Sequence, residues 1–583
     1  MNRYAWYAAS LALMMVIVGS AKAAPPESYP FTWSTVVNNG DYMPTDSCNP
    51  AAPVSPPCKK FNSYNQPSVN ARQFVVFRAR SKGEQGPVHG IYTRDMALLG
   101  PVVKICDRQT LVPQPNNLDT VFHEPPSFPR IDIDSATLVS RGNHQPVWKV
   151  SEDERLGTNG IYTNPFGNLI TGAAKLGSVP DFSFFEVPEY PGTLFDVFPG
   201  APSVTDGSII VFKGNYTVGN AGKTGVYFRE LLNMPVPLPG GGSFSGGNRP
   251  VVLIANNTDT KIPETNTVFG STAPPSAAKG MAVFAGFDNE DNPTLGGIYL
   301  APLTGTEPRL TTLVSIGQQV PGEKRKIFNR LGEGVSFDGR LVAFWGAWGT
   351  ETKNLVLQCP TEGNKERRAY CNEQYPNGAS VQVPVHQGIF VVDIRTRQIQ
   401  VIAKTPTDYD DFLYWNFSGH VPGSMEEADG EPARWRNAAF VAVSGRVAGT
   451  GASFHAAFKA RTGDVVAGVY VNPVDGIYLA QGPGRSQIVT VVETGMDGTL
   501  LDPEATDADT GAALLVTEMG IERDGLRSDS LVVNASMGSE ETGWAGIYLT
   551  NLPNQTPVLP VDVQKAHGKK KPYVPRAWRG AGG

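Results

Sequence analysis

Aromatic and acidic residues gather in one stretch, TDYDDFLYWNFSGHVPGSMEEADGEPARW, which begins at Thr407. Its members best suited to contact a ligand are Tyr409, Asp410, Asp411, Tyr414, Trp415 and Trp435. Flat aromatic faces beside carboxylates suit a sugar ring or a cation. The simpler interpretation is that the aromatic side chains form a small core of their own and that the acids are solvated. The sequence leaves both interpretations open.

The other acidic groups give no metal site. Asp507, Asp509 and Glu518 occupy the first, third and twelfth positions of a calcium-loop frame, but Ala512 stands where such a loop needs glycine. We therefore predict a turn there. No cysteine and histidine spacing resembles a zinc site, and the motifs of nucleophile elbows, HExxH proteases and phosphate-binding loops are missing. We predict no metal and no cofactor, and the sequence identifies no catalytic residue.

The five cysteines point to an oxidising compartment. Cys48 with Cys58, and Cys359 with Cys371, are close in sequence and lie in loop-like stretches, so we predict two disulfides. Cys106 ends the apolar run PVVKIC and is expected to be a small buried residue.

The first residues read as a secretory signal peptide over 1–23. Arg3 precedes an apolar run over 8–18, and a small-x-small cleavage site, Ala21-Lys22-Ala23, follows it. The run is too short for a membrane anchor, which needs about 20 apolar residues, and no later stretch could span a bilayer. Cleavage changes the formal charge from -6 to -8 because two cations leave. An acidic, secreted or periplasmic product is predicted, without nucleic-acid binding.

The elements that would position these residues repeat along the chain. A G-[IV]-[YF] tripeptide begins at Gly90, Gly160, Gly225, Gly297, Gly388, Gly476 and Gly546. An apolar run such as FVVFRA or IIVFKG precedes it, and in three clean copies 13 residues separate the phenylalanine of that run from the glycine. A further apolar run follows the tripeptide, and a short segment such as QPSVN precedes the first apolar run. Each unit thus offers four short strands, and a constant offset indicates one supersecondary unit copied in series.

Seven copies of a four-stranded unit predict an all-β fold, a β-propeller over residues 31–562. The tripeptide is expected to be structural, with glycine placed where a side chain would clash. The stretch FTWSTVV near the N-terminus resembles a fourth strand without a unit of its own. We predict that residues 31–37 pair with residues 546–549 and close the ring, because an open ring exposes strand edges.

These VAFxG…GIY repeats resemble those of bacterial exported proteins of unknown function that are predicted to be propellers, and the resemblance covers roughly residues 31–562. It implies the architecture and carries no catalytic residues. Several such proteins have sorting or anchoring tails, whereas this chain ends in a basic, glycine-ended stretch over 563–583, expected to be disordered.

Two long insertions give a candidate binding face. The connection between the second and third strands is predicted to lengthen near residues 347–387 and 446–475, in consecutive units. Long loops in compact domains are often binding elements. We predict a monomeric binding or scaffold protein whose ligand is a protein, a glycan or a cell surface. The alternative is an extracellular enzyme that acts on a polysaccharide through a carboxylate-rich site on the same face.

Overall fold

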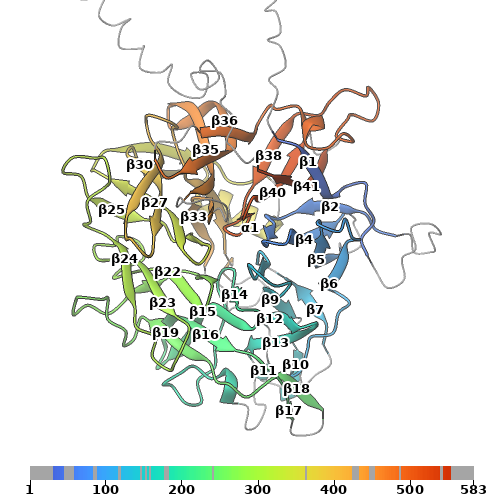
Figure 1. Ribbon diagram of the computed structural model, residues 1–583, viewed down its shortest axis with the longest axis vertical. Coiled ribbons are helices and arrows are strands. Elements are labelled where there is room, and N and C mark those ends of the chain that lie inside the picture. Colours follow the sequence, from blue (N-terminus) through green and yellow to red (C-terminus); the bar gives the residue numbers. More distant parts are fainter. Residues whose placement is uncertain are drawn as a thin grey trace, which may run out of the picture.

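The computed structural model describes residues 31–552, with gaps at 45–57, 83–87, 116–119, 126, 145–146, 152–153, 157–158, 176–182, 239–241, 362–363, 420, 423–431, 446–452, 485–487 and 539–542. The predicted signal peptide, Cys48 and the basic tail lie outside these residues. Seven antiparallel sheets form a ring, and their colours run around it in chain order (Figure 1). The chain is therefore a seven-bladed β-propeller, as the repeats predict.

The blades are numbered in chain order, and each begins at the centre of the ring. Blade 1 contains β2 (Phe61–Tyr64), β3 (Ser68–Val69), β4 (Phe74–Ser81), β5 (His89–Asp95) and β6 (Val103–Asp107), and blade 2 contains β7 (Phe122–Glu124), β8 (Arg130–Ile131), β9 (Leu138–His144), β12 (Asn159–Phe166) and β13 (Asn168–Ala174). Blade 3 contains β14 (Ser203–Thr205), β15 (Ile209–Val218), β16 (Ala221–Glu230) and β19 (Val252–Asn256). Blade 4 contains β20 (Ser271–Thr272), β21 (Ser276–Ala278), β22 (Met281–Phe287), β23 (Gly296–Pro302) and β24 (Thr311–Ser315).

Blade 5 contains β25 (Phe328–Leu331), β26 (Ser336–Phe337), β27 (Leu341–Trp348), β30 (Gln387–Asp393) and β31 (Ile399–Lys404). Blade 6 contains β34 (Val441–Gly445), β35 (Phe454–Val466), β36 (Val469–Gly482) and β37 (Ile488–Glu493). Blade 7 contains β38 (Val516–Gly520), β39 (Leu526–Arg527), β40 (Ser530–Met537), β41 (Trp544–Asn551) and β1 (Trp33–Asn38). Outside the blades lie β10 (Val147–Ser151), β11 (Glu154–Leu156), η1 (Ser183–Phe185), β17 (Leu232–Pro237), β18 (Ser243–Gly246), β28 (Thr352–Leu357), α1 (Lys365–Gln374), β29 (Ala379–Pro384), β32 (Tyr414–Ser418), β33 (Arg434–Ala438) and η2 (Gly498–Leu500).

The ring closes in two ways. The inner strands β3, β8, β14, β21, β26, β34 and β39 each contact the next, and β39 contacts β3. At the rim, β1 pairs antiparallel with β41, from Trp33 opposite Thr550 to Asn38 opposite Gly546. In Figure 1 the blue β1 accordingly lies beside the red β41. The predicted closure by the N-terminal strand is confirmed, and it covers the edge that β41 would otherwise expose.

The repeated tripeptide is explained by packing inside each blade. A Cβ added at Gly225 would lie 2.6 Å from the hydroxyl of Tyr227 and 2.8 Å from the carbonyl oxygen of Ala255. Glycine is therefore needed because the tyrosine two residues later folds back over it. Most of the other copies of the tripeptide share this arrangement, at Gly90, Gly160, Gly476 and Gly546.

The glycine that ends the preceding motif serves the same purpose for a phenylalanine. A Cβ on Gly214 would lie 2.5 Å from the ring of Phe195, and one on Gly286 would lie 2.7 Å from the ring of Phe269. In the described part of blade 3, Phe195 meets the Tyr227 ring edge-on at 4.9 Å, and Phe212 stacks on it at 6.0 Å. Both motifs thus build an aromatic cluster in the blade.

One strand of blade 6 differs from the prediction. By analogy with FVVFRA, the run AAFVAVSG, which begins at Ala438, would be the second strand of its unit. In the structure, Val441–Gly445 is instead the inner strand β34 and pairs with β35. The second strand is β35, whose Phe458 opposes Tyr478. Both runs are apolar and buried, so composition does not distinguish them. The long connection of this blade is consequently an extension of the β35–β36 hairpin, beginning near Arg461.

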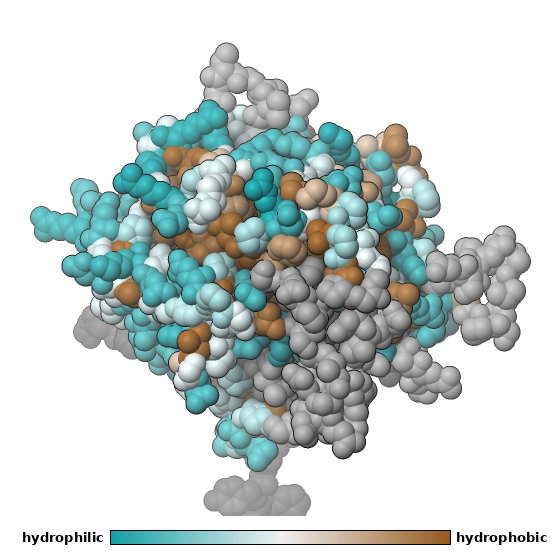
Figure 2. Space-filling view, turned by 90° about the horizontal axis from the view of Figure 1, so that it is seen from below, coloured by the Kyte–Doolittle hydropathy of each residue, from teal (hydrophilic) through white to brown (hydrophobic). Residues whose placement is uncertain are grey.

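Polar residues cover most of the described surface seen from the edge of the ring, and apolar residues show between them (Figure 2). This is ordinary for a folded domain, because there is not enough polar surface to cover it. Among the described residues, no helix has the length and apolar character needed to cross a bilayer.

Candidate functional site

One face of the ring carries the added elements. Antiparallel pairing makes the connections after the second and the fourth strand of every blade leave from the same face, which we call the insertion face. It carries the hairpin β28–β29 with α1, the hairpin β32–β33, and the extension of β35–β36. The amide of Val356 in β28 donates to the carbonyl oxygen of Gly468 at 2.8 Å. The two insertions are therefore neighbours, as strand parity predicts.

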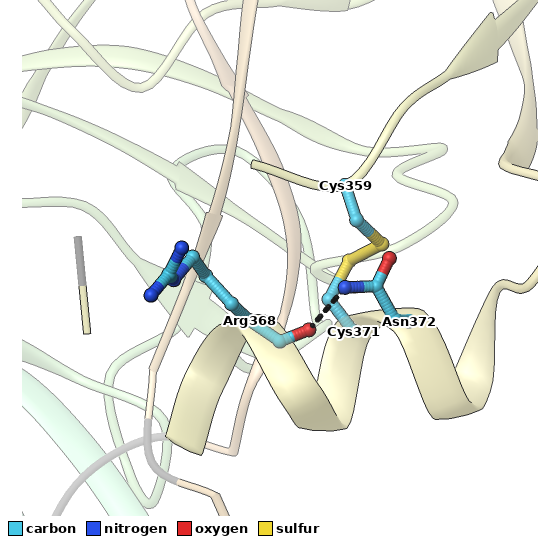
Figure 3. The surroundings of a disulfide bond; sticks show 4 residues. All are labelled: Cys359, Arg368, Cys371 and Asn372. Atoms are coloured by element: carbon cyan, nitrogen blue, oxygen red, sulfur yellow. Dashed lines mark hydrogen bonds between the residues drawn. A yellow bond between two sulfur atoms is a disulfide. The ribbon is translucent and has the colours of Figure 1, made fainter. Parts of the chain in front are cut away.

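A disulfide fastens α1 within this group. Cys359 is bonded to Cys371, and their Cα atoms lie 5.8 Å apart (Figure 3). The helix begins at Lys365, and the side chain of Asn364 just before it accepts from the amide of Arg367 at 2.8 Å and so caps it. Phe417 of β32 lies under the helix, with its ring centroid 6.4 Å from that of Tyr370. We call β28, α1, β29, β32 and β33 the cap; in Figure 1, α1 and β33 project over the middle of the ring.

The remaining cysteines agree with the prediction as far as they are described. Cys58 is in a disulfide, and its predicted partner Cys48 lies outside the described residues. Cys106 is free and buried, and burial raises the pKa of its thiol to about 12.

Most of the predicted acidic and aromatic residues make contacts inside the protein. Tyr409 is buried against Tyr478, and burial raises the pKa of its phenol well above the usual range. Asp411 is fully buried. It accepts hydrogen bonds from Gln387 Nε2 at 2.8 Å and the Tyr470 hydroxyl at 2.6 Å, and pairs with Lys353 Nζ at 3.2 Å. Its carboxylate thus joins the propeller to both insertions.

The other predicted residues also support the cap. Asp410 accepts from the amide of Gly463 at 2.9 Å, which holds the base of the β35–β36 extension. Trp435 packs against Phe417 at 5.4 Å, and Trp415 packs against the core shared by blades 5 and 6. Trp435 thus packs within its own segment, as the interpretation as a small core predicts, whereas Tyr409 and Trp415 join the core of blades 5 and 6. The structure does not gather the six residues around one ligand position.

Tyr414 is the exception, because it faces a cluster of cations. Its ring lies 5.0 Å from the Arg461 guanidinium and 4.2 Å from Lys459 Nζ. Arg461 also lies 4.9 Å from the Tyr470 ring, and it holds Asp475 by two bonds of 2.6 and 2.9 Å. Sequence reasoning missed Lys459 and Arg461. Their signal was the run FKAR, where charged residues alternate with apolar ones at the end of a buried strand.

The acidic frame near Asp507 is a turn, as predicted. One carboxylate oxygen of Asp507 accepts from the amides of Asp509 and Thr510 at 3.2 and 2.8 Å. Glu518 lies away from it on β38. No group of three metal-ligating side chains occurs among the described residues.

A polar network fills the centre of the ring. Residues 521–525 link β38 to β39, and we call them the plug. Arg130 of blade 2 is 1% exposed and donates to both carboxylate oxygens of Asp524, at 2.6 and 2.7 Å. Arg527 also donates to Asp524, and the Asp524 carbonyl accepts from the amide of Val69 in blade 1 at 3.0 Å. The plug thus connects the last blade to the first two across the axis.

Buried serines at the start of the inner strands extend this network from blade to blade. Ser68 donates to the carbonyl of Pro129 at 3.0 Å, and Ser203 donates to that of Pro275 at 2.9 Å. Ser336 donates to the carbonyl of Arg523 in the plug at 2.6 Å. Ser68 and Ser203 were also missed, although the recurring Pro-Ser pair in QPSV and APSV is visible in the sequence; Ser336 follows a valine and has no such signal.

Comparisons with known proteins add little. No model of a protein family matches this sequence, and no curated protein is found as a relative. Among solved structures, an alpha-L-arabinofuranosidase from Podospora anserina, in complex with cellotriose, is similar at 8% identity and a TM-score of 0.23. The match covers 63% of this chain and 95% of that one. A likeness this distant carries no argument about activity, and the fold assignment depends on the strand pairing itself.

Proposed function

We propose that the chain is a secreted or periplasmic, monomeric β-propeller that acts by binding, and that its ligand contacts the insertion face. The expected ligand is a protein, a glycan or a cell surface. The proposal depends mainly on one observation: most large apolar side chains that are exposed among the described residues lie on connections of this face. They are Tyr42, Leu111, Leu295, Ile327, Val466, Val469, Val471, Leu500 and Leu515.

The tip of the β35–β36 extension is the strongest part of that surface. Val466, Val469 and Val471 are 59%, 47% and 45% exposed. The hydrogen bond from the amide of Val356 to the carbonyl oxygen of Gly468 holds the tip in place. The three valines are therefore exposed on a hairpin whose position is fixed. Exposed apolar groups on a fixed element are typical of binding sites.

The alternative, an enzyme acting on a polysaccharide, requires carboxylates that face the substrate. Asp411 is buried and bonded on both oxygens. Asp475 is held by Arg461 on both oxygens. These acids therefore support the cap, and we favour binding.

The test is a binding comparison on the mature protein. A glycan array and a panel of purified cell-envelope proteins would be probed with the wild type and with the V466S/V469S/V471S variant. We expect the triple variant to lose a ligand that the wild type binds. The matched control is L98S/L99S, since Leu98 and Leu99 are 80% and 69% exposed but lie on the opposite face. Equal binding by the wild type and the triple variant would place the site elsewhere.

A further inference from the structure

The amino group of Lys459 has no hydrogen-bond acceptor and no ion-pair partner among the described residues. Lys459 is 9% exposed. The nearest groups are rings: the centroid of Tyr414 lies at 4.2 Å and that of Phe440 at 6.0 Å. The ammonium group therefore keeps N–H donors that no described acceptor of the chain uses, and these are available to a ligand.

The side chain lies between blades 6 and 7, close to the insertion face. It belongs to β35, opposite Ile477. Ala457 and Ile477, which project from the same side of the sheet, pack against residues of blade 7. Lys459 comes two residues after Ala457 and just before the extension of the hairpin begins, so it lies at the base of the proposed binding element.

The neighbouring acids do not neutralise Lys459. Asp475 is engaged by both donors of Arg461, at 2.6 and 2.9 Å. Arg461 is itself fixed between two tyrosine rings, of Tyr414 and Tyr470. Glu518, on β38 of blade 7, acts on Lys459 electrostatically but forms no ion pair with it. The immediate cluster thus holds two cations and one occupied carboxylate.

We propose that Lys459, with the rings of Tyr414 and Phe440 beside it, binds an anionic group of the ligand, a carboxylate, sulfate or phosphate. An oxyanion would supply the acceptor that the ammonium group lacks, in a charge-assisted hydrogen bond. This inference deepens the proposed function, on which it rests, because it assigns a chemical class to what the insertion face recognises.

The protonation of Lys459 makes the proposed binding dependent on pH. Burial lowers the pKa of its amine below the usual value, while Asp475 and Glu518 act to raise it and Arg461 to lower it. A bound anion favours the protonated form, and binding must weaken as the pH rises and the amine loses its proton.

The experiment is calorimetric titration of the mature protein with sodium glucuronate, sodium sulfate and sodium phosphate in separate runs. We expect saturable binding of at least one anion near neutral pH, weaker binding at higher pH, and a loss of about tenfold or more in K459M. The matched control is K279M, since Lys279 already has Asp134 as a partner, is about half exposed and lies away from the insertion face. K459R is expected to restore part of the affinity.

Two outcomes would overturn the proposal: no saturable binding of any of the three anions by the wild type, or equal binding by K459M and the wild type. If K459M does not fold, mass spectrometry of the wild type decides, because a bound anion should slow acylation of Lys459. Unchanged acylation would count against the site. The V466S/V469S/V471S variant separates the two proposals, since it should keep the anions while losing the larger ligand.

Discussion

The glycines of the tripeptide leave space for the ring of the residue two positions later. In β16, the ring of Tyr227 occupies the space beside Gly225 where a side chain would lie. The strand could not accept even a methyl group there without moving a buried ring or the facing backbone. The tyrosine is therefore kept for packing, and its recurrence in nearly every blade does not indicate a functional site.

Replacing Gly225 with alanine should destabilise the protein by about 1–3 kcal/mol, because the core is overpacked. Gly222, on the same strand, has no atom within 4 Å of an added Cβ. Gly222→Ala is the matched control and should be neutral or slightly stabilising, by less than about 1 kcal/mol. Thermal unfolding of the three proteins measures the difference. Equal melting temperatures for the two variants would contradict the packing explanation.

Residue types predicted the blade core better than the site. The GIY and VAFxG motifs carry their own packing information because the contacts are local to one sheet, such as Phe212 on Tyr227. The partners of Asp411 come from Lys353, Gln387 and Tyr470 in three separate elements. No spacing in the sequence could show that those side chains meet, and so a carboxylate that supports the cap looked like a ligand group.

At the scale of elements, α1 is held inside the cap by the disulfide from Cys371 to Cys359 and by the packing of Tyr370 against Phe417 of β32. The bonds of Asp411 to Lys353 of the cap and to Gln387 of blade 5 link the cap to the propeller. The β28–β29 pairing is regular, from Thr352 opposite Pro384 to Leu357 opposite Ala379, but α1 lies beyond the end of β28. The helix has 10 residues, which is short for a helix to be stable alone.

The variant C359S/C371S should therefore release α1 while leaving the ring intact. The disulfide joins two residues that are 12 apart in sequence. Closing a loop of that size stabilises the folded state by roughly 3 kcal/mol. We expect faster hydrogen exchange and proteolysis over residues 359–375, with the far-ultraviolet β-sheet spectrum and the main unfolding transition unchanged. Loss of the whole fold would show that the disulfide supports the ring, and unchanged exchange would show that packing alone holds α1.

At the scale of the whole molecule, two sets of contacts between the ends of the chain close the ring of blades. At the rim, β1 covers the outer edge of the last blade. At the axis, the plug joins Asp524 to Arg130, which is 394 residues away in sequence. The first was predictable because the N-terminal strand resembles a fourth strand without a blade. The second was not, because a buried arginine and its carboxylate have no local pattern and meet through closure itself.

The central network should accordingly dominate the stability of the ring. Arg130→Met leaves the buried carboxylate of Asp524 with the Arg527 side chain as its donor, and it removes the bonds that Arg130 donates to Ser203 of blade 3 and to Pro275 and Ser276 of blade 4. We therefore expect a loss of roughly 3–5 kcal/mol. Lys279→Met is the control, since the Lys279–Asp134 pair is about half exposed and should contribute at most about 1 kcal/mol.

The pH dependence gives the same network a second readout. Burial alone would raise the pKa of Asp524, but Arg130 and Arg527 outweigh it and hold that pKa below its usual value. A carboxyl whose pKa is lowered on folding stabilises the protein above its unfolded pKa of about 3.9 and loses that contribution as the pH falls through the folded pKa. Melting temperatures measured from pH 7 down to acid should fall more steeply below about pH 4 in the wild type than in D524N. Equal slopes, together with an Arg130→Met variant no less stable than Lys279→Met, would show that the plug fills the centre without holding the blades together.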